Sequence, residues 1–149
     1  MRSLRERLRE LLVGGVSPEK LALSLAAGIV LGVFPALGWT TLLCTAAAWT
    51  LRLNLPAIQL VNWLTAPLQL ALLIPFIRCG EWLFGVPASA LSVETIVGLI
   101  QADVLGAVQT LWWATMRAIV AWLLAGAAAG AALYASLVSP LRRMAEALR

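Results

Sequence analysis

The chain has 149 residues, of which 62% are hydrophobic and only 12% are charged, and its formal net charge is +4. Ordinary soluble domains carry about 25% charged residues, so this composition predicts an integral membrane protein and argues against a soluble domain. The sequence contains no histidine, and its basic residues form no stripe with aromatic residues between them. We therefore expect no nucleic-acid partner, no metal site and no cofactor.

Residues 1–16 are predicted to form an amphipathic surface helix, because leucines recur at helical spacing with arginines mostly off that face. Such a helix either lies on anionic lipid or is solvated and only fixes the topology, and the sequence leaves both open. The next helix is expected to begin at Ser17-Pro18-Glu19, with Ser17 as its cap and Pro18 at its first position.

The first long apolar run covers residues 21–51 without a charge, and Gly32-Val33-Phe34-Pro35-Ala36-Leu37-Gly38 interrupts it in the middle. Each half is shorter than the about 20 residues that a helix needs to cross a bilayer, whereas the whole is too long for one ordinary span. A re-entrant hairpin, one long kinked helix and two short spans all fit these lengths. We favour the re-entrant hairpin.

The second apolar run, residues 53–77, combines side-chain amides with prolines at positions 56, 67 and 75. Broken helices at membrane depth persist only where protein or water satisfies the freed backbone groups. We therefore expect this segment to face the protein interior and to cross the membrane with a break near Pro67. Its polar residues are Asn54, Gln59, Asn62, Thr65 and Gln69.

The remaining chain is predicted to form an interfacial segment at 86–107 and a C-terminal transmembrane helix with a basic tail at 108–149. Residues 118–141 carry no charge and form the clearest span. Gly126 and Gly130, surrounded by alanines, make a small-residue face for helix packing. That packing can lie within the fold or between two copies of the chain.

The basic residues gather near the two ends of the chain, before the first apolar run and after the last. Lysine and arginine beside membrane segments tend to stay in the cytoplasm. We therefore expect a multi-pass protein of the bacterial inner membrane with both termini cytoplasmic and with two or four full crossings. The predicted fold is all-α, in one membrane domain over residues 1–149, with a broken-helix module at 17–85.

Several short motifs carry a resemblance to a known family. They are Ser17-Pro18 before an Ala/Gly-rich run, the set Gly28, Gly32, Pro35 and Gly38, then Arg52-Leu53-Asn54, and finally Gly80-Glu81. Over Ser17–Gly85 the chain resembles the DUF2062 family of small prokaryotic membrane proteins. The family usually shows Asn-Pro-x-Thr near position 67, where this chain has Ala66-Pro67-Leu68-Gln69. The resemblance implies a broken-helix membrane module without an established activity, and the fusion of some members to glycosyltransferase domains points to lipid-linked sugars.

Two adjacent broken segments with an arginine between them form the candidate site. Broken helices expose backbone groups and helix ends that can hold anions near the middle of a bilayer, and a guanidinium suits phosphate. Packing and interhelical hydrogen bonding account for the same residues, so both interpretations stay open. The candidate headgroup residues are Gly32, Pro35, Gly38, Arg52, Asn54, Asn62, Thr65, Pro67 and Gln69.

No residue pattern indicates enzyme chemistry, because the sequence shows no paired carboxylates in one apolar segment and no nucleophile with a visible base. Our leading hypothesis is a translocator or lipid-handling module for an anionic amphiphile of the polyprenyl-phosphate class. Membrane lipids are then its partners, and we expect a homo-oligomer because so few spans barely enclose a path. The alternative is a structural protein that anchors an envelope biosynthetic enzyme.

Overall fold

The computed structural model describes residues 6, 17–87, 97–98 and 101–147, and no β-strand occurs among them. The predicted all-α class is therefore confirmed for the described part of the chain. Apart from Glu6, the predicted helix at 1–16 lies outside the described residues, as does most of the predicted interfacial segment at 86–107. The helices are α2 (Pro18–Gly32), α3 (Thr40–Leu51), α4 (Leu55–Leu64), α5 (Ala66–Leu83) and α7 (Val104–Glu146).

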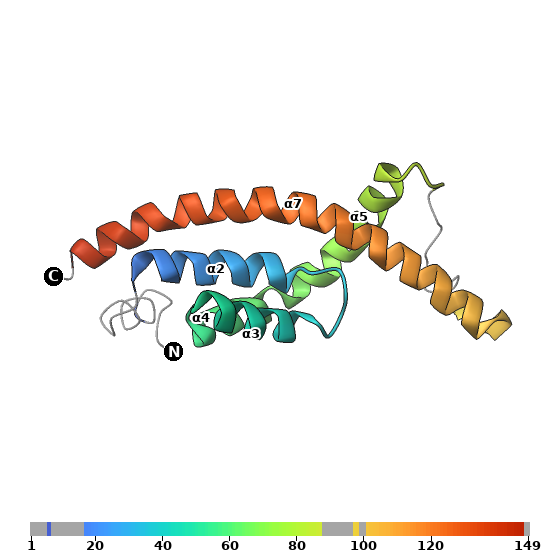
Figure 1. Ribbon diagram of the computed structural model, residues 1–149, viewed down its shortest axis with the longest axis horizontal. Helices are drawn as coiled ribbons and strands as arrows, with labels where there is room; N and C mark the ends of the chain where they lie inside the picture. Colours follow the sequence, from blue (N-terminus) through green and yellow to red (C-terminus); the bar gives the residue numbers. More distant parts are fainter. Residues whose placement is uncertain (1–5, 7–16, 88–96, 99–100, 148–149) are drawn as a thin grey trace.

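The first apolar run folds into a helical hairpin. Helix α2 begins where the sequence predicts, with the Ser17 hydroxyl accepting a hydrogen bond from the Lys20 backbone N–H at 3.3 Å. It ends at Gly32, and after a loop over residues 33–39 helix α3 returns along α2 (Figure 1). The run is thus two antiparallel helices, which rules out a single kinked helix.

Helices α4 and α5 form a bent pair. The Asn54 side chain caps α4 by accepting a hydrogen bond from the Ala57 N–H at 2.8 Å. The two helices meet at Thr65 with an angle of 64° between them. The break lies two residues before Pro67 because proline lacks an N–H and its ring disfavours helical geometry in the preceding turn. Helix α5 then continues past Pro75 to Leu83, beyond the predicted end at residue 77.

Helix α2 lies in the middle of three layers, with α7 on one side and α3 and α4 on the other (Figure 1). Helix α7 has 43 residues and is about 64 Å long, so it extends well past α2 and is crossed by α5. It begins at Val104, four residues before the predicted boundary, because the Asp103 carboxylate accepts a hydrogen bond from the Leu105 N–H at 3.0 Å.

The start of α2 and the end of α7 lie at the same end of the molecule. A buried cluster of Leu21, Ala22, Ala57 and Leu141 joins α2, α4 and α7 there. Next to it, Arg142 Nε donates a 2.7 Å hydrogen bond to a carboxylate oxygen of Glu19, which makes an ion pair across the two helices. This end of the molecule is therefore fixed by both apolar packing and charge.

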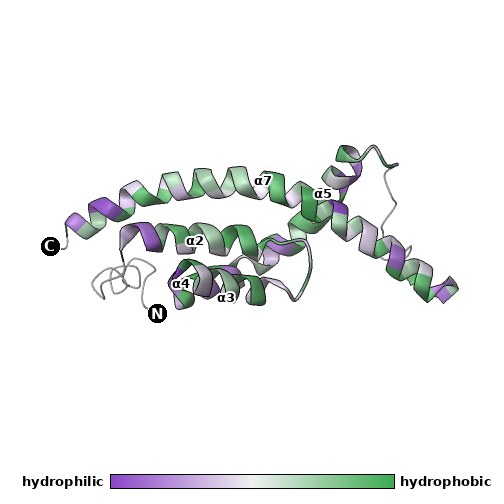
Figure 2. Cartoon of the chain, viewed as in Figure 1, coloured by the Kyte–Doolittle hydropathy of each residue, from purple (hydrophilic) through white to green (hydrophobic). Residues whose placement is uncertain are grey.

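Much of the outer surface is apolar. Among the described residues, α7 is long and apolar enough to cross a membrane, and the bent pair α4–α5 passes the same test as one unit. Figure 2 shows hydrophobic residues along α2 and the central part of α7, with hydrophilic residues at the C-terminal end of α7. Large side chains are exposed, among them Trp49 at 79% and Trp82 at 80%.

Candidate functional site

The loop between α2 and α3 is held against α5 and α7. Gln69 Nε2 donates a 2.9 Å hydrogen bond to the Phe34 carbonyl, and the Phe34 ring meets the Trp122 ring edge-on with centroids 5.0 Å apart. Pro35 is buried, and Gly38 has a φ of 86°, which glycine adopts without strain. The predicted apex is therefore a loop tied to two other helices, with Gln69 as one of its anchors.

Glycines allow α2 to lie close to α4. A Cβ on Gly28 would stand 2.9 Å from the Ile58 carbonyl oxygen, and a Cβ on Gly32 would overlap the Thr65 hydroxyl. That hydroxyl donates a 2.9 Å hydrogen bond to the Asn62 carbonyl. Gly32, Asn62 and Thr65, three of the predicted site residues, thus meet at one point between the two helices.

Side-chain amides join α4 to α3. Gln59 Nε2 donates to the Thr41 carbonyl at 3.0 Å and to Thr45 Oγ1 at 2.9 Å. Asn62 Nδ2 donates to Gln59 Oε1 at 3.2 Å and to Thr41 Oγ1 at 3.4 Å. Asn62 Oδ1 is buried and accepts no hydrogen bond within the described part of the chain. Three of these four hydrogen bonds therefore join α4 to α3.

Arg52 and Asn54 lie away from the loop. Arg52 follows the last residue of α3, which has 12 residues, so it lies about 18 Å along the helix from the loop. Its backbone is left-handed with a φ of 52°, and its side chain is exposed. The Asn54 N–H donates to the Ser24 hydroxyl at 3.0 Å while its side chain caps α4. These two candidates therefore do not share a site with Pro35, Gly38 or Gln69.

Helices α5 and α7 cross in direct backbone contact at Gly80, where an added Cβ would lie 2.6 Å from the carbonyl atoms of Arg117. Both helices carry charged residues next to this point in the sequence. Arg78 pairs with Glu81 at 3.5 Å, and Glu81 is 2% exposed. Arg117 Nε is buried without a hydrogen-bond partner among the residues that the structure describes. We call Arg78, Gly80, Glu81 and Arg117 the α5–α7 crossing.

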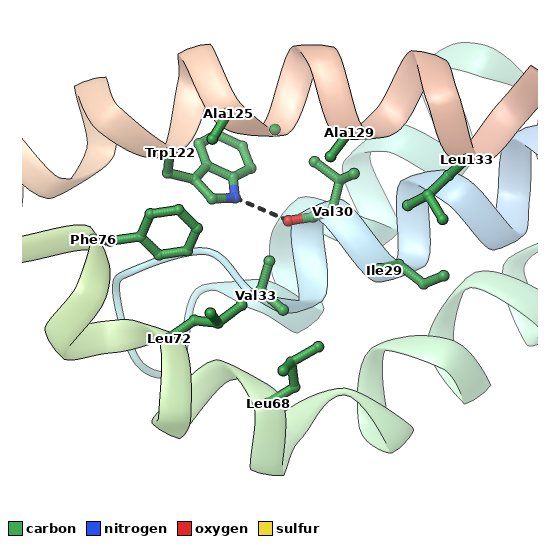
Figure 3. A pocket seen from close by; sticks show the side chains of 11 residues that line it. Ile29, Val30, Val33, Leu68, Leu72, Phe76, Trp122, Ala125, Ala129 and Leu133 are labelled. Carbon is green, nitrogen blue, oxygen red and sulfur yellow. Dashed lines mark hydrogen bonds between the residues drawn. The ribbon is translucent and has the colours of Figure 1, made fainter. Parts of the chain in front are cut away.

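An apolar groove of about 170 Å³ lies between α2, α5 and α7 (Figure 3). Val33 just after α2, Phe76 from α5 and Ala129 from α7 are among its lining residues, and none of the lining residues is charged. Trp122 forms one wall, fixed by a 3.0 Å hydrogen bond from its indole Nε1 to the Val30 carbonyl. The groove can hold an apolar group but offers it no ion pair.

Gly126 and Gly130 face α2 of the same chain. A Cβ on Gly126 would stand 3.1 Å from one methyl of Val30, and a Cβ on Gly130 would stand 3.4 Å from the other. Gly126 also lines the groove, so its missing side chain both admits Val30 and leaves space beside it. No group of three or more metal-ligating side chains occurs in the described ranges.

The groove and the α5–α7 crossing lie outside the predicted site. The small-residue stripe at Gly126 and Gly130 was one signal for the groove, since small side chains leave room between helices. The crossing was harder to predict from the sequence, because Gly80 and Arg117 are far apart in the chain. Only the packing of α5 on α7 brings them together.

The architecture is that of an all-α chain with a helical hairpin, a bent helix pair and one long apolar helix. The chain belongs to the family described as uncharacterized protein conserved in bacteria (DUF2062), which it matches over residues 1–148. The match is longer than the resemblance at Ser17–Gly85. Neither the comparison with curated proteins nor the one with solved structures gave a match. Function must therefore be argued from the geometry.

Proposed function

We propose that this is a membrane-spanning protein in which α7 and the bent pair α4–α5 cross the bilayer while the α2–α3 hairpin is re-entrant. The uncharged residues 118–141 extend about 36 Å, enough for a hydrocarbon core of about 30 Å. Helix α2, with 15 residues, extends only about 22 Å. The Glu19–Arg142 pair holds the start of the hairpin beside the end of α7, and the basic residues there favour the cytoplasmic side.

Within this topology, the protein handles an anionic amphiphile of the polyprenyl-phosphate class and holds part of its hydrocarbon chain in the groove between α2, α5 and α7. The observation that carries this proposal is the uncharged lining of that groove. A cavity of about 150 Å³ with an aliphatic lining can bind a benzene-sized group, so a groove of about 170 Å³ has room for a short segment of a lipid chain.

Translocation of the amphiphile is the second part of the proposal. Helices shorter than the hydrocarbon thickness make the surrounding bilayer thinner. The α2–α3 hairpin is such an element, and its loop at residues 33–39 lies next to the groove through Val33 and Phe34. A thinner bilayer beside the groove shortens the path that a polar headgroup must cross, while its chain stays among apolar side chains.

The test is mass spectrometry of lipids retained by the gently purified protein, comparing wild type with Ala129→Phe and Ala128→Phe. Both alanines are exposed neighbours on α7, but only Ala129 lines the groove. We expect a polyprenyl phosphate enriched over the bulk membrane in wild type and in Ala128→Phe, and lost in Ala129→Phe. Bulk phospholipid alone, unchanged between the three proteins, would remove the basis of the proposal.

An anchoring role is the second candidate, and one observation favours it. The amides of Gln59, Asn62 and Gln69 each donate a hydrogen bond to another part of the fold, which is how a purely structural module would use them. In this case an envelope biosynthetic enzyme would co-purify with the protein at fixed stoichiometry. The groove-filling variant Ala129→Phe would still co-purify with that enzyme. It would also retain the same lipids as wild type.

A further inference from the structure

We propose that the anionic headgroup of this amphiphile binds at the α5–α7 crossing, with Arg117 as its principal ligand. This inference rests on the proposed lipid-handling function and adds to it a headgroup site that differs from the sequence candidate Arg52.

The groove leads to the crossing along two helices at once. Phe76 lines the groove and lies four residues before Gly80 on α5. Trp122 lines it from α7 and lies four residues after Ala118, whose backbone nitrogen stands 3.0 Å from the Cβ position of Gly80. Four residues of helix correspond to about 6 Å. A chain lying in the groove therefore places its end within about one helical turn of Arg117.

The charge at the crossing suits a phosphate. Arg78 and Glu81 pair with each other, so Arg117 is the cation at the crossing that makes no ion pair with a described residue. Arg117 Nε is buried and makes no hydrogen bond to any described residue. A buried donor is normally satisfied, and leaving it without a partner is unfavourable. A guanidinium presents several N–H donors in a planar fork that matches phosphate oxygens, which is the chemistry that the proposed headgroup site needs.

Arg52 is less well placed to receive the headgroup. It follows α3, on the side of α2 opposite α7, and its exposed side chain lies at the end of α3 away from the loop. In the proposed topology, residues 118–141 separate Arg117 from the basic end at Arg142, so the crossing lies at the extracytoplasmic edge of the bilayer. In this topology the headgroup binds in the outer leaflet.

The experiment is a calorimetric titration of the full-length protein in a neutral detergent with farnesyl phosphate, farnesol and inorganic phosphate. Wild type is expected to bind farnesyl phosphate about tenfold more tightly than farnesol, the size of effect that a charged hydrogen bond gives. Arg117→Gln should remove most of this preference while leaving farnesol affinity unchanged. Arg117→Lys should keep part of it, because the charge remains without the planar fork.

Arg143→Gln is the matched control, since it removes one positive charge from the other end of the same helix, where the side chain is exposed. It should bind all three compounds as wild type does. A preference for farnesyl phosphate that survives in Arg117→Gln would overturn the inference. Inorganic phosphate binding as tightly as farnesyl phosphate would overturn it as well, because the site would then serve a free anion.

The two proposals fail in different ways. If Ala129→Phe abolishes farnesol binding but Arg117→Gln changes nothing, binding of the hydrocarbon chain in the groove is supported and only the headgroup site is wrong. If wild type binds neither farnesyl compound, or if Ala129→Phe binds both as wild type does, the lipid-handling function itself is wrong. Elution of each variant at the wild-type position in size-exclusion chromatography shows that loss of binding is not loss of the fold.

Discussion

Gly32 is the residue at which a single added methyl group would disturb the contact between α2 and α4. Its Cβ would overlap the Thr65 hydroxyl and lie 3.3 Å from the Asn62 Cα. We expect Gly32→Ala to lower the free energy of unfolding by about 1–3 kcal/mol, the usual cost of overpacking. The measurement is denaturant unfolding in detergent.

Gly130→Ala is the control for this substitution. Its Cβ would meet Val30 at 3.4 Å, an ordinary contact, and alanine favours helix over glycine by about 1 kcal/mol. Gly130→Ala should therefore be neutral or slightly stabilising. The double variant Gly32→Ala, Thr65→Ala should recover part of the loss, because it removes the overlapping hydroxyl. Equal effects of both glycine substitutions would contradict the close approach seen at Gly32.

Glu19 makes the stability depend on pH. Its pKa lies below the ordinary value of 4.5, first because the carboxylate accepts a hydrogen bond from its own backbone N–H, and then because Arg142 donates a side-chain hydrogen bond to it. A carboxyl group whose pKa is lowered by folding stabilises the fold above its ordinary pKa. This stabilisation is lost as the pH falls through the lowered value.

We therefore expect Glu19→Gln to melt at a lower temperature than wild type at pH 7. The difference should shrink as the pH falls below the ordinary pKa of the carboxyl group and disappear below the lowered pKa. Thermal melting of both proteins in the same detergent at several pH values measures this. The effect should be small, since the carboxylate is solvent-exposed. A difference that stayed constant down to the acid end would mean that packing, and not charge, is lost in the variant.

Among the helices, the beginnings and breaks were predictable from the sequence, whereas the contacts between helices were not. Ser17 and Pro18 mark the start of α2 through local hydrogen bonding and a fixed φ, and both effects act within one turn. Pro67 likewise marks the bend before α5. The contact of Gly80 with Arg117 depends instead on how α5 lies across α7, which no local pattern encodes. The groove follows from the same packing.

The end of α3 shows how a local conformation can be separated from a functional role. Arg52 adopts a left-handed φ of 52°, where a residue with a Cβ is strained by about 1–2 kcal/mol and glycine is not. We expect Arg52→Gly to raise the free energy of unfolding by up to about 1 kcal/mol, and Arg52→Ala to leave it nearly unchanged. Denaturant unfolding of the three proteins compares them.

Both Arg52 variants should retain the same lipids as wild type, because the headgroup is proposed to bind at Arg117. Lipid mass spectrometry on the purified variants checks this second expectation. Loss of an anionic lipid in both Arg52→Gly and Arg52→Ala would mean that Arg52 binds the headgroup, whatever the unfolding measurements show. Loss in neither variant fits a residue whose main structural effect is to end α3.

At the scale of the whole molecule, the length of the hairpin decides how many crossings the proposed topology contains. Helix α2 reaches about 22 Å from its cap, which is less than a hydrocarbon core of about 30 Å. Helix α5, in contrast, continues to Leu83 and crosses α7 at Arg117, at the far end of the uncharged stretch of α7. The loop at residues 33–39 should therefore stop inside the membrane, while the end of α5 should emerge.

Single cysteines in a background without Cys44 and Cys79 test this with a membrane-impermeant maleimide added outside the cell. Leu37 lies in the loop and is exposed in the fold, Phe84 follows α5, and Arg143 lies in the last turn of α7. We expect Phe84→Cys to react from outside, Arg143→Cys to react only after the membrane is opened, and Leu37→Cys to stay unlabelled from outside. Labelling of Leu37→Cys as fast as Phe84→Cys would mean that α2 and α3 cross as two short spans, because only then would water outside the cell reach the loop.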